Sequence, residues 1–98
     1  MSIFSWLMKW FKSKCNGGWE HYYVGVKIET LDNPGWSIEI ELSDTDLEDK
    51  HFEKINIDNG DDDWFVCWVE KNKFNGAGDP DKLEKIIEIF RDWVESVT

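Results

Sequence analysis

The residues of this chain that could take part in catalysis are few and scattered. Glu20 and His21 are neighbours and form the best candidate for a general acid–base pair. The chain contains no GxSxG nucleophile motif, no phosphate-binding P-loop and no HExxH zinc-protease motif. We therefore expect that the protein is not an enzyme, and we assign no catalytic residue.

Metal binding would need clustered cysteine, histidine or carboxylate ligands. The two cysteines and two histidines are Cys15, His21, His51 and Cys67, and their spacing matches no zinc pattern such as paired CxxC motifs. The acidic run Asp58–Asp63 lacks the ligand order and the closing glutamate of an EF-hand loop, so it is predicted to be a solvated hairpin turn. We expect no metal site and no cofactor.

The glycine-rich segment Phe74–Gly78 precedes a predicted helix, which is the position of many phosphate-binding loops. It carries no lysine, and Asp79 and Asp81 would repel an anion at this place. We interpret the segment as a turn that leads into a helix capped by Asp79.

Length and charge restrict the class of protein further. A chain of 98 residues suggests one domain over residues 1–98. Residues 1–15 carry three lysines and no acid, whereas the other 83 residues carry 8 basic and 21 acidic side chains. This strongly acidic part of the chain would repel nucleic acid and anionic membranes and would attract a basic partner. We expect neither a nucleic acid nor a membrane as partner.

Two features predict a cytoplasmic protein. The two cysteines do not make a disulfide framework, which fits a reducing compartment. The apolar stretch at residues 3–7 has no basic residue before it and no small-residue cleavage site after it, so it is a poor signal peptide. It is also too short to span a membrane.

The elements that position these residues are predicted to be a helix, four strands and a second helix. Apolar residues at helical spacing predict helices over residues 3–14 and from Asp79 onward. Alternating patterns predict strands at 21–31, 36–42, 52–58 and 64–71. The first two strands have one apolar and one charged face, which is typical of a sheet solvated on one side. The predicted fold is α+β, a four-stranded antiparallel sheet with the N-terminal and C-terminal helices packed on one face.

The segment ETLDNPGW, Glu29–Trp36, connects the first two predicted strands. Pro34 suits the first position of a type II turn, and Gly35 tolerates the positive φ of the second. We interpret the segment as a hairpin turn that fixes the register of the two strands.

The predicted strand at 64–71 is apolar on both faces, unlike the others. One stripe contains Phe65, Cys67 and Val69, and the other contains Trp64, Val66 and Trp68. We expect the first stripe in the core, because cysteine is usually buried, and the tryptophan stripe outside. The opposite assignment remains possible, and so does a tryptophan stripe covered by the loop at 43–50 or by a second copy of the chain.

Several segments together resemble a known family. They are CNGGWEH at Cys15–His21, GVKIETLDNPGW at Gly25–Trp36, DDW at Asp62–Trp64, FNGAG at Phe74–Gly78, and the closing amphipathic helix. This order resembles the immunity protein 53 family of bacterial polymorphic toxin systems, over nearly the whole chain. The resemblance implies a small cytoplasmic protein, encoded with a toxin, that neutralises the toxin by stoichiometric binding. It implies no catalytic residues.

The candidate toxin-binding residues follow from the charged face and the tryptophan stripe. They are Trp64, Val66, Trp68, Glu39, Glu41 and Asp58. The acids would steer a toxin with a basic surface, and the indole rings would anchor it. We expect a monomer or a weak dimer. The alternative hypothesis is a homodimeric structural or adaptor module in which the tryptophan stripe is a self-interface.

Overall fold

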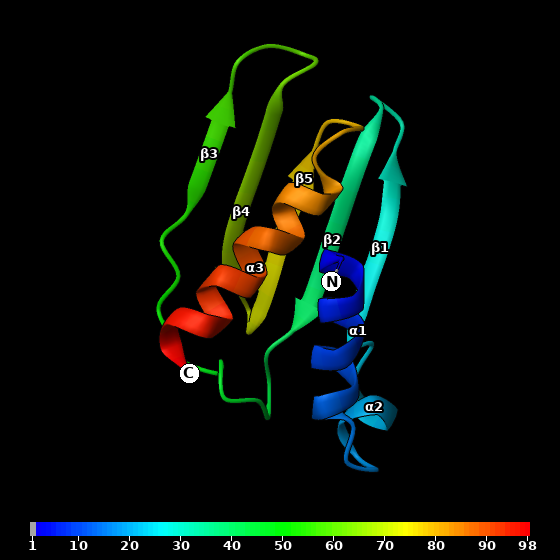
Figure 1. Cartoon of the computed structure of the whole chain (residues 1–98), viewed down its shortest axis with the longest axis vertical. Helices are drawn as coiled ribbons and strands as arrows, with labels where there is room; N and C mark the ends of the chain where they lie inside the picture. Colours follow the sequence, from blue (N-terminus) through cyan, green and yellow to red (C-terminus); the bar gives the residue numbers. More distant parts are fainter. Residues whose placement is uncertain (1) are drawn as a thin grey trace.

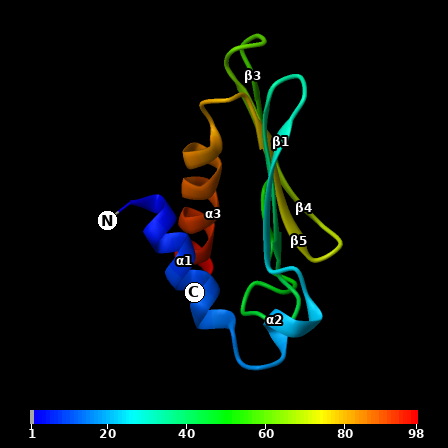
Figure 2. The same ribbon diagram turned by 90° about the vertical axis from the view of Figure 1, so that its right-hand side faces the viewer.

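The computed structural model describes residues 2–98, which form a sheet covered on one face by two long helices (Figure 1). The elements in chain order are α1 (Ile3–Lys14), α2 (Trp19–Tyr22), β1 (Val26–Leu31), β2 (Gly35–Glu41), β3 (Ile55–Asp58), β4 (Trp64–Glu70), β5 (Lys73–Gly78) and α3 (Leu83–Val97). Both α1 and α3 lie on the same side of the sheet (Figure 2). The predicted α+β class, the antiparallel sheet and the placement of the helices are confirmed. No helix within residues 2–98 is long and apolar enough to cross a bilayer.

The sheet has five strands in the order β1-β2-β5-β4-β3, and not the predicted four. The missed strand, β5, is the central one, and it pairs antiparallel with β2 and with β4. Its sequence KFNGAG has a low strand propensity because of its glycines. Tertiary pairing on both sides overrides that propensity, so the predicted glycine-rich turn is wrong.

The glycines of β5 let α3 approach the sheet closely. A Cβ atom at Gly76 would collide with the side chain of Ile86 on α3 and would lie 3.1 Å from Cγ2 of Ile38 on β2. At Gly78 a Cβ atom would lie 2.8 Å from the Cβ of Lys82. The helix therefore lies directly over the central strand because that strand presents no side chains at these positions.

Several predicted boundaries differ from the structure. The predicted strand at 21–31 starts only at Val26, because its first two residues belong to the short helix α2 and the next three connect α2 to β1. The Asn16 Oδ1 atom accepts the backbone N–H groups of Gly18 (2.9 Å) and Trp19 (3.0 Å) and so fixes the start of α2. The predicted strand at 52–58 is shortened to Ile55–Asp58, and the last helix begins at Leu83 and not near Asp79.

The hairpin between β1 and β2 forms as predicted, but its turn is not type II. The Asn33–Pro34 peptide bond is cis, and Gly35 does not have a positive φ. Gly35 begins β2, and a Cβ atom there would collide with the backbone carbonyl of Gly78 on β5. This glycine is therefore required by the close approach of two strands and not by the turn itself.

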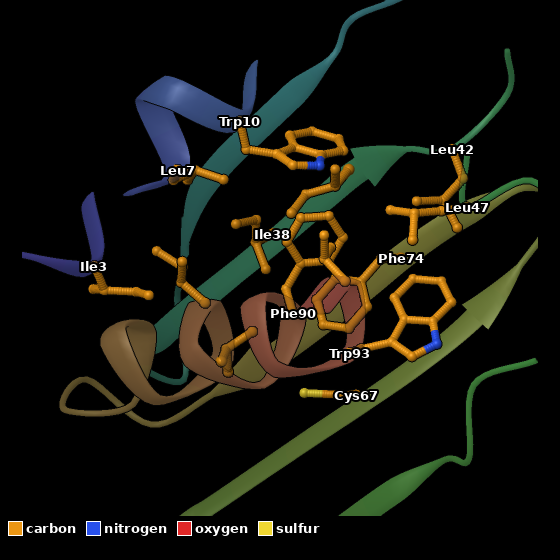
Figure 3. Close-up of a cluster of buried hydrophobic side chains, with 14 of the residues drawn as sticks. Ile3, Leu7, Trp10, Ile38, Leu42, Leu47, Cys67, Phe74, Phe90 and Trp93 are labelled. Atoms are coloured by element: carbon orange, nitrogen blue, oxygen red, sulfur yellow. The ribbon is translucent and has the colours of Figure 1, made fainter. Parts of the chain in front are cut away.

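The core lies between the sheet and the helices and is rich in aromatic rings (Figure 3). Phe90 of α3 contacts Trp10 of α1 edge-on, with ring centroids 5.0 Å apart, and it also contacts Phe74 of β5. Trp93 donates its indole N–H to the His51 carbonyl at 2.8 Å. Leu47, from the loop at 43–50, is buried in this core. The loop is thus anchored on the helix side of the sheet (Figure 2).

Candidate functional site

One face of the sheet is left uncovered by the helices (Figure 2). We call it the open face and define it by the side chains that alternate with those of the core: Lys27, Glu29, Ser37, Glu39, Glu41, Asn56, Asp58, Trp64, Val66, Trp68, Glu70, Lys73, Asn75 and Ala77. Its acids, Glu29, Glu39, Glu41, Asp58 and Glu70, outnumber its lysines, Lys27 and Lys73. All six residues predicted to bind a toxin lie on this face.

The orientation of β4 agrees with the expected one. Phe65 and Cys67 are buried in the core, and burial raises the pKa of the Cys67 thiol to about 12. Trp64, Val66 and Trp68 point to the open face and are half-buried. The opposite assignment of the two stripes is therefore wrong.

The tryptophan stripe lies against small and polar neighbours. Ala77 on β5 is opposite Val66, and Asn75 on β5 is opposite Trp68. The indole N–H of Trp68 donates to Oε1 of Glu70 at 3.2 Å, which holds the ring beside a carboxylate. The stripe thus lies partly exposed beside a small and a polar neighbour on β5, on a face that carries charged side chains.

The three predicted carboxylates differ in their exposure. The Glu39 carboxylate is about half exposed and lies 3.7 Å from the Lys73 ammonium. Asp58 is exposed, and its Oδ1 atom accepts the backbone N–H of Gly60 at 3.1 Å. Glu41 is only 7% exposed, and its Oε2 atom accepts the backbone N–H of Ser43 at 3.3 Å. Glu41 therefore adds negative charge to the open face but little surface that a partner could contact.

A hollow of about 320 Å³ lies beside Trp64, between the two hairpins at one end of the open face. It is lined by Asn33, Asn56, Ile57, Asp58, Asp61, Trp64 and Val66. Asn33 belongs to the β1–β2 hairpin, which brings the ETLDNPGW segment to the rim of the predicted site. No pattern in the sequence indicates that this segment and the tryptophan stripe meet, because they are far apart along the chain.

A second hollow, of about 310 Å³, lies at the other end of the open face. It is lined by Tyr22, Tyr23, Val24, Lys27, Glu39, Glu41 and Lys73. The Tyr23 hydroxyl donates to Oδ2 of Asp44 at 3.1 Å, and this bond together with partial burial raises the pKa of the phenol. The two tyrosines were predicted to be strand residues, but α2 and the segment after it turn them toward this hollow.

The start of β4 is held by a buried carboxylate, that of Asp79. Its Oδ2 atom accepts the backbone N–H of Trp64 at 2.9 Å and lies 2.8 Å from the Lys82 ammonium, which also contacts Asp63 at 2.9 Å. Its Oδ1 atom accepts the backbone N–H of Asp81 at 2.8 Å. Hydrogen bonding to Lys82 lowers the pKa of both Asp79 and Asp63. Asp79, predicted as a helix cap, instead positions the strand that carries Trp64.

The candidate catalytic and metal-binding residues do not come together. The Glu20 carboxylate accepts the backbone N–H groups of Asn16 (3.0 Å) and Gly17 (2.8 Å), and not the His21 ring. Backbone hydrogen bonds from Glu20 itself, Gly17 and Asn16 lower the pKa of this carboxyl group. Within residues 2–98, no three His, Cys, Asp or Glu side chains are clustered so as to hold a metal ion. Glu20 thus caps the turn before α2.

Comparison with known proteins gives one match. A family described as Immunity protein 53 matches residues 4–95, which is nearly the whole chain. No curated protein and no solved structure matches the chain. The matched region includes every strand and the greater part of α1 and of α3, and with them the whole open face. The chain belongs to the immunity protein 53 family.

Proposed function

We propose that this protein binds a cognate toxin through the open face and neutralises it by stoichiometric, non-catalytic inhibition in the cytoplasm. Membership of an immunity protein family supports toxin neutralisation in general. The observation that carries the choice of surface is the tryptophan stripe of β4, which lies half-exposed among carboxylates on the uncovered side of the sheet. Exposed apolar area of this kind marks interaction surfaces.

The two kinds of side chain on the open face have separate tasks. Trp64 and Trp68 supply large rigid rings, and tryptophan is among the residues most enriched at binding hot spots. The surrounding acids, among them the half-exposed Glu39 and the exposed Asp58, attract a basic toxin surface and accelerate encounter. The partner is therefore a toxin with a basic surface.

The size of the open face suits such a complex. The protein exposes 6175 Å² in total. A standard interface buries about 800 Å² on each partner, which would be about an eighth of this surface. The two hollows at the ends of the open face offer places into which toxin side chains insert beside Trp64 and beside Tyr22.

Co-expression with the toxin encoded beside this protein tests the function. We expect the cells to grow and the two proteins to co-purify in equal amounts. Replacement His21→Ala should retain full protection, because no chemistry at that histidine is needed. A protein that neither restores growth nor co-purifies with that toxin would show that the proposed function is wrong.

Substitution of the stripe tests the surface. Trp64→Ala and Trp68→Ala should each weaken toxin binding about 30-fold, which corresponds to about 2 kcal/mol for a hot-spot residue. Ile89→Ala on α3 is the matched control, because Ile89 is also half-buried and apolar but lies in the helix layer. Binding is measured by calorimetry, and folding by thermal unfolding. Equal affinity of the tryptophan variants and the control would exclude the stripe as the binding surface.

The alternative, a self-interface made by the tryptophan stripe, predicts a different result. In that case Trp64→Ala and Trp68→Ala would convert a dimer into a monomer, and toxin binding would be unaffected.

A further inference from the structure

The outer edge of β1 is an unpaired strand edge. β1 lies at one end of the sheet, and within residues 2–98 β2 is its one pairing partner (Figure 1). The backbone N–H of Glu41 donates to the Gly25 carbonyl at 2.9 Å, so Gly25 and the alternate residues after it face β2. The backbone groups of Val26, Ile28 and Thr30 therefore point away from the sheet. Such a row of free donors and acceptors is a template for another strand.

Apolar side chains border this edge on the helix side. Phe4 and Met8 of α1 are 40% and 65% exposed, and Ile28 of β1 is 39% exposed. A hollow of about 460 Å³ between α1 and β1 is lined by Leu7, Met8, Phe11 and Val26. The free edge is thus accompanied by apolar surface that a neighbouring molecule would remove from water.

The charged side chains of β1 indicate which strand could pair with this edge. Lys27 and Glu29 lie on the open face on either side of Ile28, with Nζ and Oε1 3.3 Å apart. If a second β1 strand pairs antiparallel about a two-fold axis through Ile28, Lys27 of each copy lies opposite Glu29 of the other. Opposite charges at directly facing positions stabilise an antiparallel pair. The sequence around Ile28 is therefore complementary to itself.

The backbone geometry agrees with the same register. A two-fold axis at Ile28 places the two Ile28 residues opposite each other and each Val26 opposite Thr30 of the other copy. These are the residues whose backbone groups point outward, so the pairing forms about six hydrogen bonds. The charged pairs then occupy the positions without backbone hydrogen bonds, where side chains approach most closely.

The opposite edge of the sheet, strand β3, is shorter than β1. β3 has only four residues and ends at Asp58, next to the acidic turn that contains Asp61, Asp62 and Asp63. A pair of copies joined along its four residues would form fewer backbone hydrogen bonds than one joined along the six residues of β1.

We propose that the edge of β1, together with the adjoining apolar face of α1, is an interface with a second copy of this chain. The two copies join their five-stranded sheets into one continuous sheet. The two-fold axis is perpendicular to the sheet, so both open faces lie on the same side and both remain free. The assembly therefore presents two uncovered acidic faces side by side and is compatible with two bound partners.

Sedimentation velocity over a range of concentrations tests the dimer and its charge pairing. The wild-type protein should dimerise. Glu29→Lys places lysines opposite lysines across the axis and should weaken dimerisation about tenfold. The double variant Lys27→Glu, Glu29→Lys restores opposite pairs and should restore the dimer. Asn56→Lys, at the β3 edge, is the matched control and should leave the dimer unchanged.

Cross-linking tests the register independently. Across a hydrogen-bonded antiparallel pair the Cα atoms are about 5.5 Å apart, a distance that a disulfide spans. With Cys15→Ser to remove the accessible native thiol, Ile28→Cys should form a covalent dimer under mild oxidation, whereas Thr30→Cys should not. Thermal unfolding of the reduced variants checks that both are folded. A wild-type protein that is monomeric at every concentration, or equal cross-linking at both positions, would overturn the proposal.

Discussion

Asp79 holds the start of the strand that carries the tryptophan stripe. Its carboxylate is fully buried, and it joins the first residue of β4 to the segment that leads into α3. Lys82 supplies the compensating charge, and without it a buried carboxylate would be strongly destabilising. The side chain that holds Trp64 in place is thus one that no toxin would contact.

The pH dependence of stability follows from this residue. The lowered pKa of Asp79 means that its ionised form stabilises the folded state at neutral pH, and that this contribution is lost as pH falls below about 4 and through the folded pKa. Asp79→Asn should lower Tm by several degrees at pH 7, and the difference from wild type should shrink in acid. Asp81→Asn, at an exposed neighbour, is the control and should have little effect. A Tm difference that is constant from pH 7 to pH 2 would contradict this account.

Among the elements, β5 decides the architecture. It joins the β1–β2 hairpin to the β3–β4 hairpin, so both halves of the open face depend on it. On its core side, α3 lies over Gly76, and on its open side Asn75 and Ala77 leave room for the tryptophan stripe. A strand with larger side chains on either side would displace the helix or cover the stripe.

The packing of α3 on β5 can be tested by adding one methyl group. Gly76→Ala places a Cβ atom against Ile86 and should destabilise the protein by about 1–3 kcal/mol through overpacking. Ala77→Ser, the next residue on the same strand but on the open face, should change stability by less than about 0.5 kcal/mol. Urea unfolding measures both free energies. Wild-type stability of Gly76→Ala would mean that α3 can move away without cost.

Over the whole molecule, the open face and the edge of β1 differ in charge. The net charge is −10, and the open face carries an excess of carboxylates. The helix α1 carries Lys9, Lys12 and Lys14 and no acid, and it lies beside the β1 edge. Charge therefore favours a basic partner on the open face, while the edge of β1, with Lys27 and Glu29, is locally neutral.

The charge of the whole molecule predicts how salt affects the encounter with the toxin. The screening length falls from about 10 Å at 0.1 M salt to about 3 Å at 1 M, so the association rate constant should fall steeply as salt is added. The dissociation rate should change much less. Stopped-flow fluorescence of the tryptophans measures both rates.

A pair of neutralising variants locates the effect on the surface. Glu39→Gln on the open face should lower the association rate more than Glu84→Gln on α3, although each removes one charge. An association rate that does not depend on salt would contradict electrostatic guidance by the open face.

Much of the fold was predictable because the information was local. The apolar positions of α3 recur at helical spacing, and those of β2 alternate, so each element follows from its own sequence. The orientation of β4 was predictable because Phe65 and Cys67 suit a packed interior. The candidate residues Trp64 and Trp68 were placed on the open face for the same reason. Their role in binding a toxin stays a prediction.

The features that the sequence could not reveal depend on contacts between distant segments. β5 reads as a glycine-rich turn, and it is a central strand only because β2 and β4 flank it and α3 rests on its glycines. Glu41 belongs to the charged face by alternation, yet it is buried at the end of β2, where its carboxylate accepts the backbone N–H of Ser43. The hollow that joins Asn33 to Trp64 also exists only after the sheet has formed.

The helices, the alternating strands, the acidic charge and the resemblance to the immunity protein family could all be inferred from the sequence, because each depends on composition or on residues that are neighbours in the chain. Tertiary structure alone decided which strand is central, which edge of the sheet is free, and how the open face is shaped. The physical reason is that pairing and burial join residues far apart in the chain, and local propensity carries no information about those partners.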